Sequence, residues 1–593
     1  MLDRTRHDFP DQRTDRVVSA GSGPHPEPAG WFKQLFRMRM DKSRQRLVWV
    51  ALIFMGLYGA IASRLIHYAS HPETTQSLRR ASGEAIAAAR PDIVDRNGAV
   101  LATDVKITSL FVEPRRLIDK DEAVELITAI FPEINPRELR EKFSGRRGFV
   151  WIKREITPKQ QAEVHSLGLP GIGFMSEHKR IYPNGTAASH ILGAVNIDNV
   201  GIAGIEKYVD SLGLADLSGA GFSVQAEDLK PVRLSIDLAV QHALRDELFK
   251  GMTKYKAKAT AGMIIDVETG EIAALASLPD FDPNVPSQAL DPNRMNRMTV
   301  GVYEMGSTFK ALTTAMGLDS GKFNINSTLD ARTSLRYGKF SIGDYHAQHR
   351  IMTVPEVFIH SSNIGSARIA LSVGVSAHQA FLRKMGVLDR LRTELPESAE
   401  PLVPKNWSEL STVTIAYGHG VAVAPIQAVM ATAATVNGGL LIPPTFLPRS
   451  PEKVKDLARP VLKPETSEAL RYVMRLNATK GSASRAAVPG YFVGGKTGTA
   501  DKSIHGHYQG DKLFTTFMAV TPADKPRYLY LVVMDEPQVI PETMGYKTAG
   551  WNAGPVTGAV IERTAPMLGL TPRFEPPANP FPTMMKLGAW GTK

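Results

Sequence analysis

Three short motifs in this 593-residue chain combine hydroxyl, amine and amide side chains in patterns that suit nucleophilic catalysis. Ser307 and Lys310 stand one helical turn apart at the start of an amphipathic segment, so a helix would place both on one face. Ser361 and Asn363 lie 54 residues beyond Ser307, and Lys496 opens a Lys-Thr-Gly-Thr run 135 residues later. A helix amino terminus and a nearby ammonium favour negative charge on a serine oxygen, and a neutral lysine can accept its proton. The first pair can therefore make an activated serine nucleophile.

The Ser-x-x-Lys spacing is a weak signal by itself, because a serine at the start of a helix is more often a cap than a nucleophile. The spacing recurs at 176–179 and 450–453, where Ser450 before Pro451 is typical of a helix cap. The other two motifs favour the catalytic interpretation. The chain has one Ser-x-Asn, at 361–363, and one Lys-Thr-Gly, at 496–498, and both follow the Ser307 motif.

Composition excludes several other chemistries. Cysteine is absent, which removes thiolate nucleophiles, disulfides and cysteine-ligated metals. His346 with His349, and His505 with His507, lack a convincingly spaced third ligand, so we expect no metal and no cofactor. The net charge of +11 is not concentrated in a stripe, since residues 1–46 hold only ten Lys/Arg against six Asp/Glu. We therefore expect no nucleic-acid partner.

Five apolar runs predict the strands that carry the Lys496 motif. Two pairs flank short turns, and a fifth run contains Lys496; the five are 261–267, 271–277, 514–520, 528–534 and 492–500. About 200 residues with helical spacing lie between the second strand and the fifth. The pattern predicts a five-stranded antiparallel sheet flanked by helices, with an all-helical insertion. The Asn97-Gly98 pair predicts a hairpin turn, and Thr353 with Glu356 predicts a capping box.

A single apolar segment near the amino terminus predicts a membrane anchor. Residues 47–63 carry no charge, and the span extends to 66 if Arg64 snorkels to the headgroups. Basic residues dominate just before it, so the positive-inside rule keeps the tail in the cytoplasm. A cleaved signal peptide and a buried core helix are the alternatives; the 46-residue leader disfavours the first and the polar tail the second.

The three motifs in this order resemble those of the class B penicillin-binding proteins, and most closely the FtsI-type, division-specific peptidoglycan D,D-transpeptidases. The resemblance extends from the anchor to about residue 565. Ser362 stands where the related β-lactamases have aspartate, and Met305 stands where the family usually has proline. Further segments that resemble the family are 90–98, 296–298, 417–420 and 425–427.

The resemblance implies a role for each motif residue. Ser307 would attack the carbonyl between the two terminal D-alanines of a stem peptide, with Lys310 as base. Ser361 would relay protons, Asn363 would orient Lys310 and bind the substrate amide, and Lys496 would supply positive charge.

The remaining implied roles concern the substrate. Thr497, Gly498 and Thr499 would bind it, the two hydroxyls holding the terminal carboxylate. The backbone N–H groups of Ser307 and Thr499 would form the oxyanion hole. An amine of a second stem peptide would accept the acyl group, and β-lactams would act as inhibitors. Glu304, near the nucleophile, is expected to form a structural ion pair rather than to act as a base.

The sequence thus predicts an α+β/α/β chain in five parts. These are a basic, largely disordered cytoplasmic tail at 1–46, a transmembrane helix at 47–66, a periplasmic α+β pedestal module at 67–225, a transpeptidase domain at 226–568 and an irregular, Pro-rich tail at 569–593. We expect a single-pass protein of the bacterial inner membrane at the division septum. The expected partners are an FtsW-type glycan polymerase and other divisome proteins.

Four alternative functions remain open. An elongation-specific transpeptidase would share every catalytic motif. A non-catalytic divisome scaffold would share the fold but has no need of all three motifs. A β-lactamase is disfavoured by the anchor and the extra module, and a β-lactam-sensing receptor would need more membrane spans.

Overall fold

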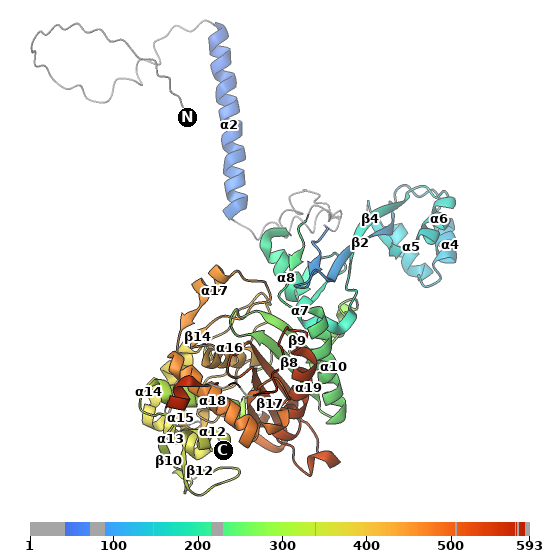
Figure 1. Ribbon diagram of the computed structural model, residues 1–593. Coiled ribbons are helices and arrows are strands. Elements are labelled where there is room, and N and C mark those ends of the chain that lie inside the picture. Colours follow the sequence, from blue (N-terminus) through green and yellow to red (C-terminus); the bar gives the residue numbers. More distant parts are fainter. Residues whose placement is uncertain are drawn as a thin grey trace, which may run out of the picture. The chain divides into compact units, whose positions relative to one another are not determined.

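The computed structural model describes residues 42–70, 89–145, 148–214, 229–338, 340–504, 507–575, 577 and 580–586. The chain divides into two compact units, Met1–Ser82 and Gly83–Lys593. Figure 1 shows the elements of both units along the sequence.

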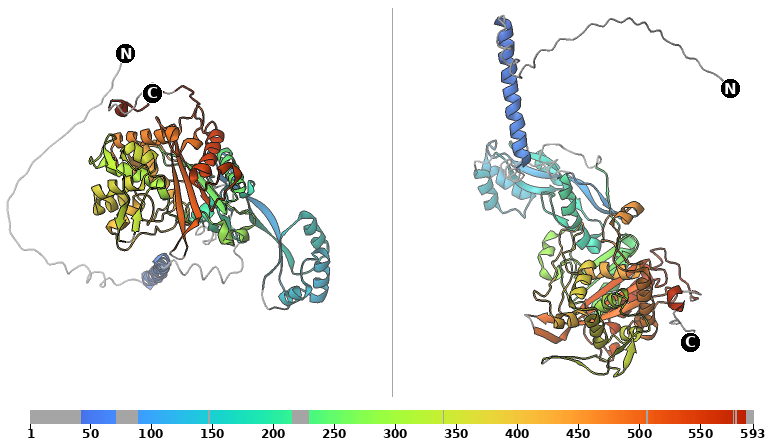
Figure 2. Two further views of the ribbon diagram at one scale, coloured as in Figure 1. Left: turned by 90° about the horizontal axis from the view of Figure 1, so that it is seen from below. Right: turned by 90° about the vertical axis from the view of Figure 1, so that its left-hand side faces the viewer.

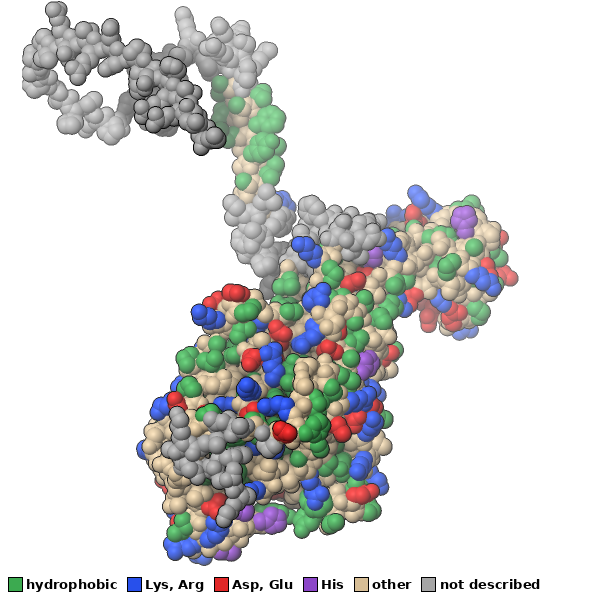
Figure 3. All heavy atoms as spheres, in the orientation of Figure 1, with side chains coloured by type: hydrophobic (Ala, Val, Ile, Leu, Met, Phe, Trp, Pro, Cys, Tyr) green, Lys and Arg blue, Asp and Glu red, His purple; other side chains and the backbone are tan. Residues whose placement is uncertain are grey.

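Helix α2, Lys42–Ser70, is the described part of the first unit. Its described side chains, at 48–64, include exposed apolar ones such as Trp49 and Met55, drawn in green in Figure 3. Among the residues whose side chains are described, no helix has the length and hydropathy needed to span a bilayer. The span predicted at 47–66 runs past those side chains at both ends and stays a prediction. Residues 1–41 of the predicted tail lie outside the described residues.

The second unit begins with a mixed sheet and the helices packed on it. The sheet has the order β3-β2-β1-β7, with β4 also paired to β2. The predicted hairpin is confirmed: β1 pairs antiparallel with β2 around Gly98, whose φ of +92° suits glycine. The strands are β1 Ile93–Val94, β2 Val100–Val112, β3 Val150–Ile156, β4 Ile172–Ile181 and β7 Val232–Arg233. Helices α4 Lys120–Ile130, α5 Pro136–Ser144 and α6 Pro158–Ser166 share an apolar core with β2 and β3.

A buried ionic network joins distant parts of this module. Glu206 accepts hydrogen bonds from Arg90 at 2.8 Å and from Arg180 at 2.6 Å, and both arginines are at most 5% exposed. Asp104 pairs with Arg180 at 3.1 Å. Because removing one partner would leave a buried charge uncompensated, this network fixes how the strands meet α8. The elements around it are α7 Ser189–Leu192, β5 Ala194–Val195, β6 Gly201–Ala203 and α8 Gly204–Val209.

The second sheet carries the Lys-Thr-Gly motif at its edge. Its order is β16-β17-β18-β8-β9, with every neighbouring pair antiparallel, and Figure 2 shows the long strands seen from two further sides. The strands are β8 Ala259–Asp266, β9 Ile272–Leu278, β16 Gly494–Ile504, β17 His507–Thr521 and β18 Tyr528–Asp535. The five predicted strands are confirmed in position and in direction.

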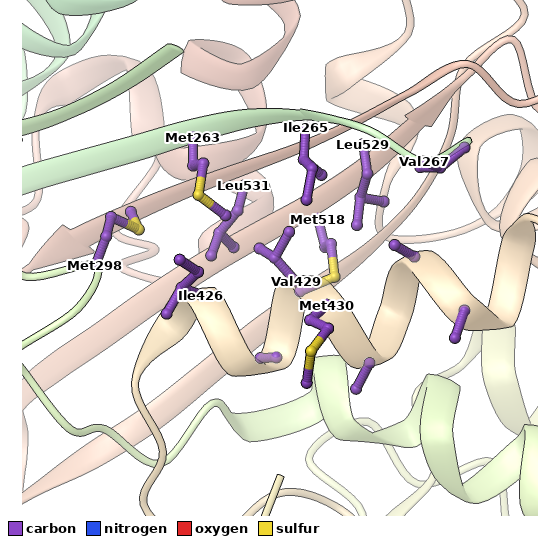
Figure 4. Packing of buried hydrophobic residues seen from close by; sticks show 14 of the residues in the cluster. Met263, Ile265, Val267, Met298, Ile426, Val429, Met430, Met518, Leu529 and Leu531 are labelled. Carbon is purple, nitrogen blue, oxygen red and sulfur yellow. The ribbon is translucent and has the colours of Figure 1, made fainter. Parts of the chain in front are cut away.

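Helices cover both faces of this sheet, because successive strand residues point to opposite sides. Met263 and Ile265 pack with α16 Pro425–Val436, as Figure 4 shows. Ile264 points the other way and packs with α10 Leu238–Lys254 and α19 Ala553–Thr564. The strands are therefore buried on both faces, which explains their continuous apolar runs.

The insertion is mostly helical, but the prediction that it is all-helical is wrong. Three two-stranded ladders interrupt it: β10 Thr328–Asp330 with β13 Ile351–Thr353, β11 Leu335–Tyr337 with β12 Phe340–Ile342, and β14 Leu440–Leu441 with β15 Arg459–Pro460. Strands of two or three residues are too short to show an alternating pattern. Besides α16, its helices are α11 Lys310–Asp319, α12 Val354–Ile359, α13 Asn363–Val373, α14 Val375–Lys384, α15 Glu409–Ile415, α17 Pro451–Leu457 and α18 Pro464–Lys480.

Part of the C-terminal tail is ordered, contrary to the expectation of an irregular segment. Residues Pro582–Lys586 form helix α20. Phe581 is fully buried, and Glu468 on α18 accepts a hydrogen bond from the Thr583 N–H at 2.6 Å. The prolines obscured this short helix, although Pro582 occupies its first position, where proline is favoured.

Charge is mixed on the visible surface of the second unit. Figure 3 shows Lys and Arg side chains interspersed with Asp and Glu on that face, with no continuous basic stripe across it.

Candidate active site

The nucleophile motif lies at the start of a helix, as predicted. A 3-10 turn, η6 Gly306–Phe309, runs directly into α11 Lys310–Asp319. Gly306 has a φ of +54°, a conformation that favours glycine. Ser307 is half-buried, and its hydroxyl has no hydrogen-bond partner among the described residues. Lys310 is 1% exposed, so burial holds its amine inside the site.

The side chains of all three motifs meet at the Ser361 hydroxyl. Lys310 Nζ donates to Ser361 Oγ at 3.1 Å and to Asn363 Oδ1 at 2.7 Å, and it also donates to the Ser361 carbonyl. Lys496 Nζ donates to the same Oγ at 2.9 Å and to the Thr497 carbonyl at 3.2 Å. Ser361 Oγ therefore bridges two lysines that are far apart in the sequence.

Burial lowers the pKa of both lysines. The pKa of Lys310 falls well below 10.5, because its ammonium is desolvated and lies near Lys496; the Asp344 carboxylate opposes this effect. Desolvation also lowers the pKa of Lys496, to about 7. Because the two ammonium groups repel each other, the two lysines titrate as a coupled pair. One of the two amines is therefore unprotonated near neutral pH.

The middle motif is held by local backbone geometry. The predicted capping box is present: Thr353 and Glu356 cap α12, which ends just before Ser361. Ser361 has a φ of +54°, an uncommon value for serine that turns its hydroxyl toward the lysines. Ser362 then caps α13 by accepting from the Gly365 N–H at 2.9 Å. Ser362 thus orients the helix and does not contact either lysine.

Asp344 is a residue of this site that the motifs did not predict. Its carboxylate accepts from Ser362 Oγ at 2.7 Å and from the Asn363 N–H at 2.6 Å. It also accepts from the Ile364 N–H at 3.0 Å, so it sits at the amino terminus of α13. Asp344 lies in a loop before β13, and no sequence pattern links it to Ser361. A tertiary contact brings the two together.

The third motif occupies the edge strand β16, which packs tightly against the nucleophile turn. A Cβ on Gly498 would lie 2.5 Å from the Met305 carbonyl oxygen, so only glycine fits there. Thr497 Oγ1 and Ser482 Oγ are 2.8 Å apart, and Thr499 Oγ1 accepts from the Ala549 N–H at 3.1 Å. Accepting that bond leaves the Thr499 hydroxyl proton available to a ligand.

The nucleophile turn lies against the backbone of the third motif, where the oxyanion hole is predicted. A Cβ on Gly306 would lie 3.0 Å from the backbone N of Thr499. The peptide before Ser307 is therefore in close contact with the Thr499 backbone. The oxyanion hole formed by the Ser307 and Thr499 N–H groups stays a prediction.

The two other Ser-x-x-Lys segments, 176–179 and 450–453, do not form a second site. Ser176 lies within strand β4, where a residue three positions on is not on the same face. Ser450 caps α17 by accepting from the Lys453 N–H at 3.3 Å, as predicted.

The side chains of the histidine pair 505 and 507 lie outside the described residues. His349 Nδ1 lies 3.3 Å from the Arg332 carbonyl. Across the described stretches, no three His, Asp or Glu side chains are grouped as metal ligands.

Comparison with known proteins supports the same chemistry. Residues 260–562 match the profile of the penicillin binding protein transpeptidase domain, and residues 85–212 match that of the penicillin-binding protein dimerisation domain. Over 503 residues the chain is 38% identical to the probable peptidoglycan D,D-transpeptidase FtsI of Caulobacter vibrioides, covering 83% of each chain. This chain belongs to the class B penicillin-binding proteins. It is a serine-type peptidoglycan D,D-transpeptidase of the FtsI family.

Other relatives of this penicillin-binding protein carry similar names. It is 30% identical over 510 residues to the probable peptidoglycan D,D-transpeptidase PenA of Neisseria gonorrhoeae, covering 82% of this chain and 86% of that one. It is 27% identical over 516 residues to the peptidoglycan D,D-transpeptidase FtsI of Escherichia coli, covering 82% and 84%. A solved peptidoglycan synthetase from Bifidobacterium adolescentis shares its fold, with a TM-score of 0.64 and 22% identity over 84% of this chain and 98% of that one.

Proposed function

We propose that this penicillin-binding protein cross-links stem peptides at the division septum through an acyl-enzyme on Ser307. The observation that carries the mechanism is the Ser361 hydroxyl, which joins Lys310 and Lys496 at 3.1 and 2.9 Å. A buried pair of lysines with lowered pKa values supplies a base at neutral pH without any metal or cofactor.

Acylation requires one proton transfer in each direction. Lys310, as the neutral amine, accepts the Ser307 proton while the serine oxygen attacks the carbonyl between the two D-alanines. The C–N bond then breaks, and the leaving D-alanine amine takes a proton from the Lys310, Ser361 and Lys496 chain. Asn363 holds Lys310 in place at 2.7 Å, and its side chain would also bind the substrate amide.

Substrate binding uses the free edge of β16. Within the described ranges no strand pairs with the outer side of β16, so an extended stem peptide can add along it. The Thr497 and Thr499 hydroxyls, with the Lys496 charge behind them, suit the terminal carboxylate of the donor. Gly498 contributes by letting the strand approach the nucleophile turn. The N–H groups of Ser307 and Thr499 would stabilise the oxyanion.

The cellular role is proposed as septal because the relatives with the name FtsI match across most of the chain. The elongation-specific role is the competing proposal. The test is depletion of the protein in cells that carry a fluorescent fusion. Mid-cell fluorescence with filamentation supports septal cross-linking, whereas side-wall fluorescence with rounded cells would replace it by the elongation role.

The domain boundaries and the anchor complete the proposal. We place a membrane helix at 47–66, a periplasmic pedestal module at 67–225, a transpeptidase domain at 226–568 and a tail at 569–593. The small residues Gly56, Gly59, Ala60 and Ser63 suit close helix packing in lipid, and an FtsW-type polymerase is the proposed partner.

A chimera tests this partner contact. Replacing residues 47–66 with an unrelated membrane helix should weaken co-purification with the polymerase while the periplasmic domain still binds penicillin. Full rescue of division by the chimera would show that the segment only anchors.

A further inference from the structure

A second group of polar side chains lies beside the nucleophile turn and has no role in the acylation chemistry above. Residues 303–306 run antiparallel to 418–423: the Gly306 N–H donates to the Gly418 carbonyl at 3.2 Å, and Tyr303 and Val423 exchange two 3.0 Å hydrogen bonds. A Cβ on Gly418 would overlap the Gly306 carbonyl at 1.8 Å. The loop that carries His419 is therefore fixed directly against the turn that carries Ser307.

Glu304 connects this loop to strand β17. Its Oε1 accepts from the Gly420 N–H at 2.7 Å and from the Tyr508 hydroxyl at 2.9 Å. No basic side chain pairs with it among the described residues, so the sequence-based expectation of a structural ion pair is wrong. Its other oxygen, Oε2, is buried and has no hydrogen-bond partner within the described part of the chain.

His419 is the second group with an unpaired buried atom at this place. Its Nδ1 is buried and has no partner within the same described residues. Burial lowers the pKa of the imidazole, the nearby Lys310 charge lowers it further, and the Glu304 carboxylate raises it. The centroid of its ring lies 5.4 Å from the ring centroid of Tyr417 and 6.1 Å from that of Tyr508. His419 is therefore within electrostatic reach of both a carboxylate and the catalytic amine.

We propose that His419 is the general base that deprotonates the acceptor amine, and that Glu304 is a positioning residue that orients its imidazole. The inference rests on the proposed acyl-enzyme function. The acceptor arrives as an ammonium, which cannot attack a carbonyl until it loses a proton. The ammonium loses two protons in the transfer, and Lys310 carries one of them to Ser307 Oγ, so the other needs a separate acceptor. An orienting carboxylate behind an imidazole is a recurrent arrangement for such a base, and its hydrogen bonds are often long before substrate binds.

The acceptor ammonium gives one proton to His419, and the neutral nitrogen attacks the acyl carbon on Ser307. A C–N bond forms and the C–Oγ bond breaks. The second nitrogen proton passes through Lys310 to Ser307 Oγ, and His419 later releases its proton to solvent. The products are the cross-linked amide and the free serine.

The test separates acylation from transfer in the purified full-length protein. The protein is given a thioester donor that ends in a D-alanine analogue, together with D-alanine at increasing concentrations as the acceptor amine. The rate of aminolysis of the acyl-enzyme is compared with its rate of hydrolysis. Acylation by a fluorescent penicillin is measured on the same samples.

His419→Gln should slow aminolysis about 100-fold, the usual size of a general-base contribution, and change acylation less than about threefold. His242→Gln, at an exposed position on α10, is the matched control and should match the wild type in both measurements.

The pH profile distinguishes a base from a structural residue. The groups that face His419 are Glu304 from the preceding segment, Lys310 from α11, Tyr508 from β17 and Tyr417 from its own loop. Aminolysis in the wild type should fall at low pH as His419 is protonated. Glu304→Gln should slow aminolysis about tenfold. It should also shift the fall of aminolysis to lower pH, because the loss of a negative charge near the imidazole lowers the pKa of His419.

Two results would overturn the inference. If His419→Gln slows acylation and aminolysis equally, His419 has a structural role and is not the base for the acceptor. If aminolysis is unchanged, His419 takes no part in the transfer step. Failure of the wild type itself to acylate would instead refute the proposed function.

Discussion

Replacing Lys496 by methionine should make the protein more stable while abolishing its acylation. Burial holds the pKa of Lys496 at about 7 against an ordinary value of 10.5, which at about 1.4 kcal/mol per unit corresponds to roughly 5 kcal/mol of destabilisation when the lysine is charged. Methionine has a similar volume and no charge to desolvate. It loses the hydrogen bonds to Ser361 and to the Thr497 carbonyl, which offsets on the order of 2–3 kcal/mol. The expected net gain is roughly 2–3 kcal/mol.

The gain should depend on pH with a definite sign. A lysine whose pKa is lowered in the folded state binds fewer protons than in the unfolded state between about 7 and 10.5, so the stability of the wild type rises with pH across that window. The advantage of Lys496→Met is therefore largest at and below pH 7 and shrinks toward pH 10. Thermal unfolding at pH 6.5 and 9.5 measures both values.

Lys502 on the same strand provides the matched control. It pairs with Asp535 at 2.7 Å and Glu536 at 2.6 Å, and these carboxylates raise its pKa. Lys502→Met should therefore lower the melting temperature, the opposite of Lys496→Met. If both substitutions destabilise the protein to the same extent, the claim that Lys496 is held at an energetic cost is refuted.

Three further predictions concern the same site. Ser361→Ala should slow penicillin acylation about 10²- to 10³-fold in stopped-flow measurements, because both lysines lose their shared hydroxyl; a change below threefold would exclude the relay. Asp344→Asn should slow acylation about tenfold and lower the melting temperature, since weaker acceptors would then face Ser362 and the Asn363 N–H; wild-type values for both would refute its positioning role. The penicillin adduct on Ser307 should persist for at least minutes, because no residue is assigned to activate water on the acyl-enzyme; its loss within seconds by mass spectrometry would contradict this.

The sheet was predictable because its strands are buried on both faces and appear as unbroken apolar runs. Ile264 and Met263 are neighbours that both pack in a core, on opposite sides of β8. The Ser307 helix was predictable from the amphipathic spacing that follows Ser307, and Gly321, with a φ of +74°, lies just beyond its last residue, Asp319. Local patterns therefore located the elements that carry each motif.

What the sequence missed depends on contacts between distant segments. Asp344 lies in a loop and accepts a hydrogen bond from the backbone N–H of Asn363, at the amino terminus of α13. Ser361 adopts a positive φ, which is uncommon for serine and is not indicated by the sequence. Glu304 was expected in an ion pair, but its acceptor oxygen faces a backbone N–H and a tyrosine. The short ladders and helix α20 are stabilised by packing against larger elements and carry almost no pattern of their own.

The most direct test of the account is the site of the penicillin adduct. The wild type and two variants are treated with penicillin, and intact mass and peptide mapping locate the adduct. We expect one adduct per chain on Ser307, none in Ser307→Ala, and wild-type labelling in Ser450→Ala, whose serine only caps α17. Thermal unfolding should show that Ser307→Ala remains folded, since it removes one half-buried hydroxyl. A folded Ser307→Ala that still labels at the wild-type rate would place the nucleophile elsewhere and contradict the central claim.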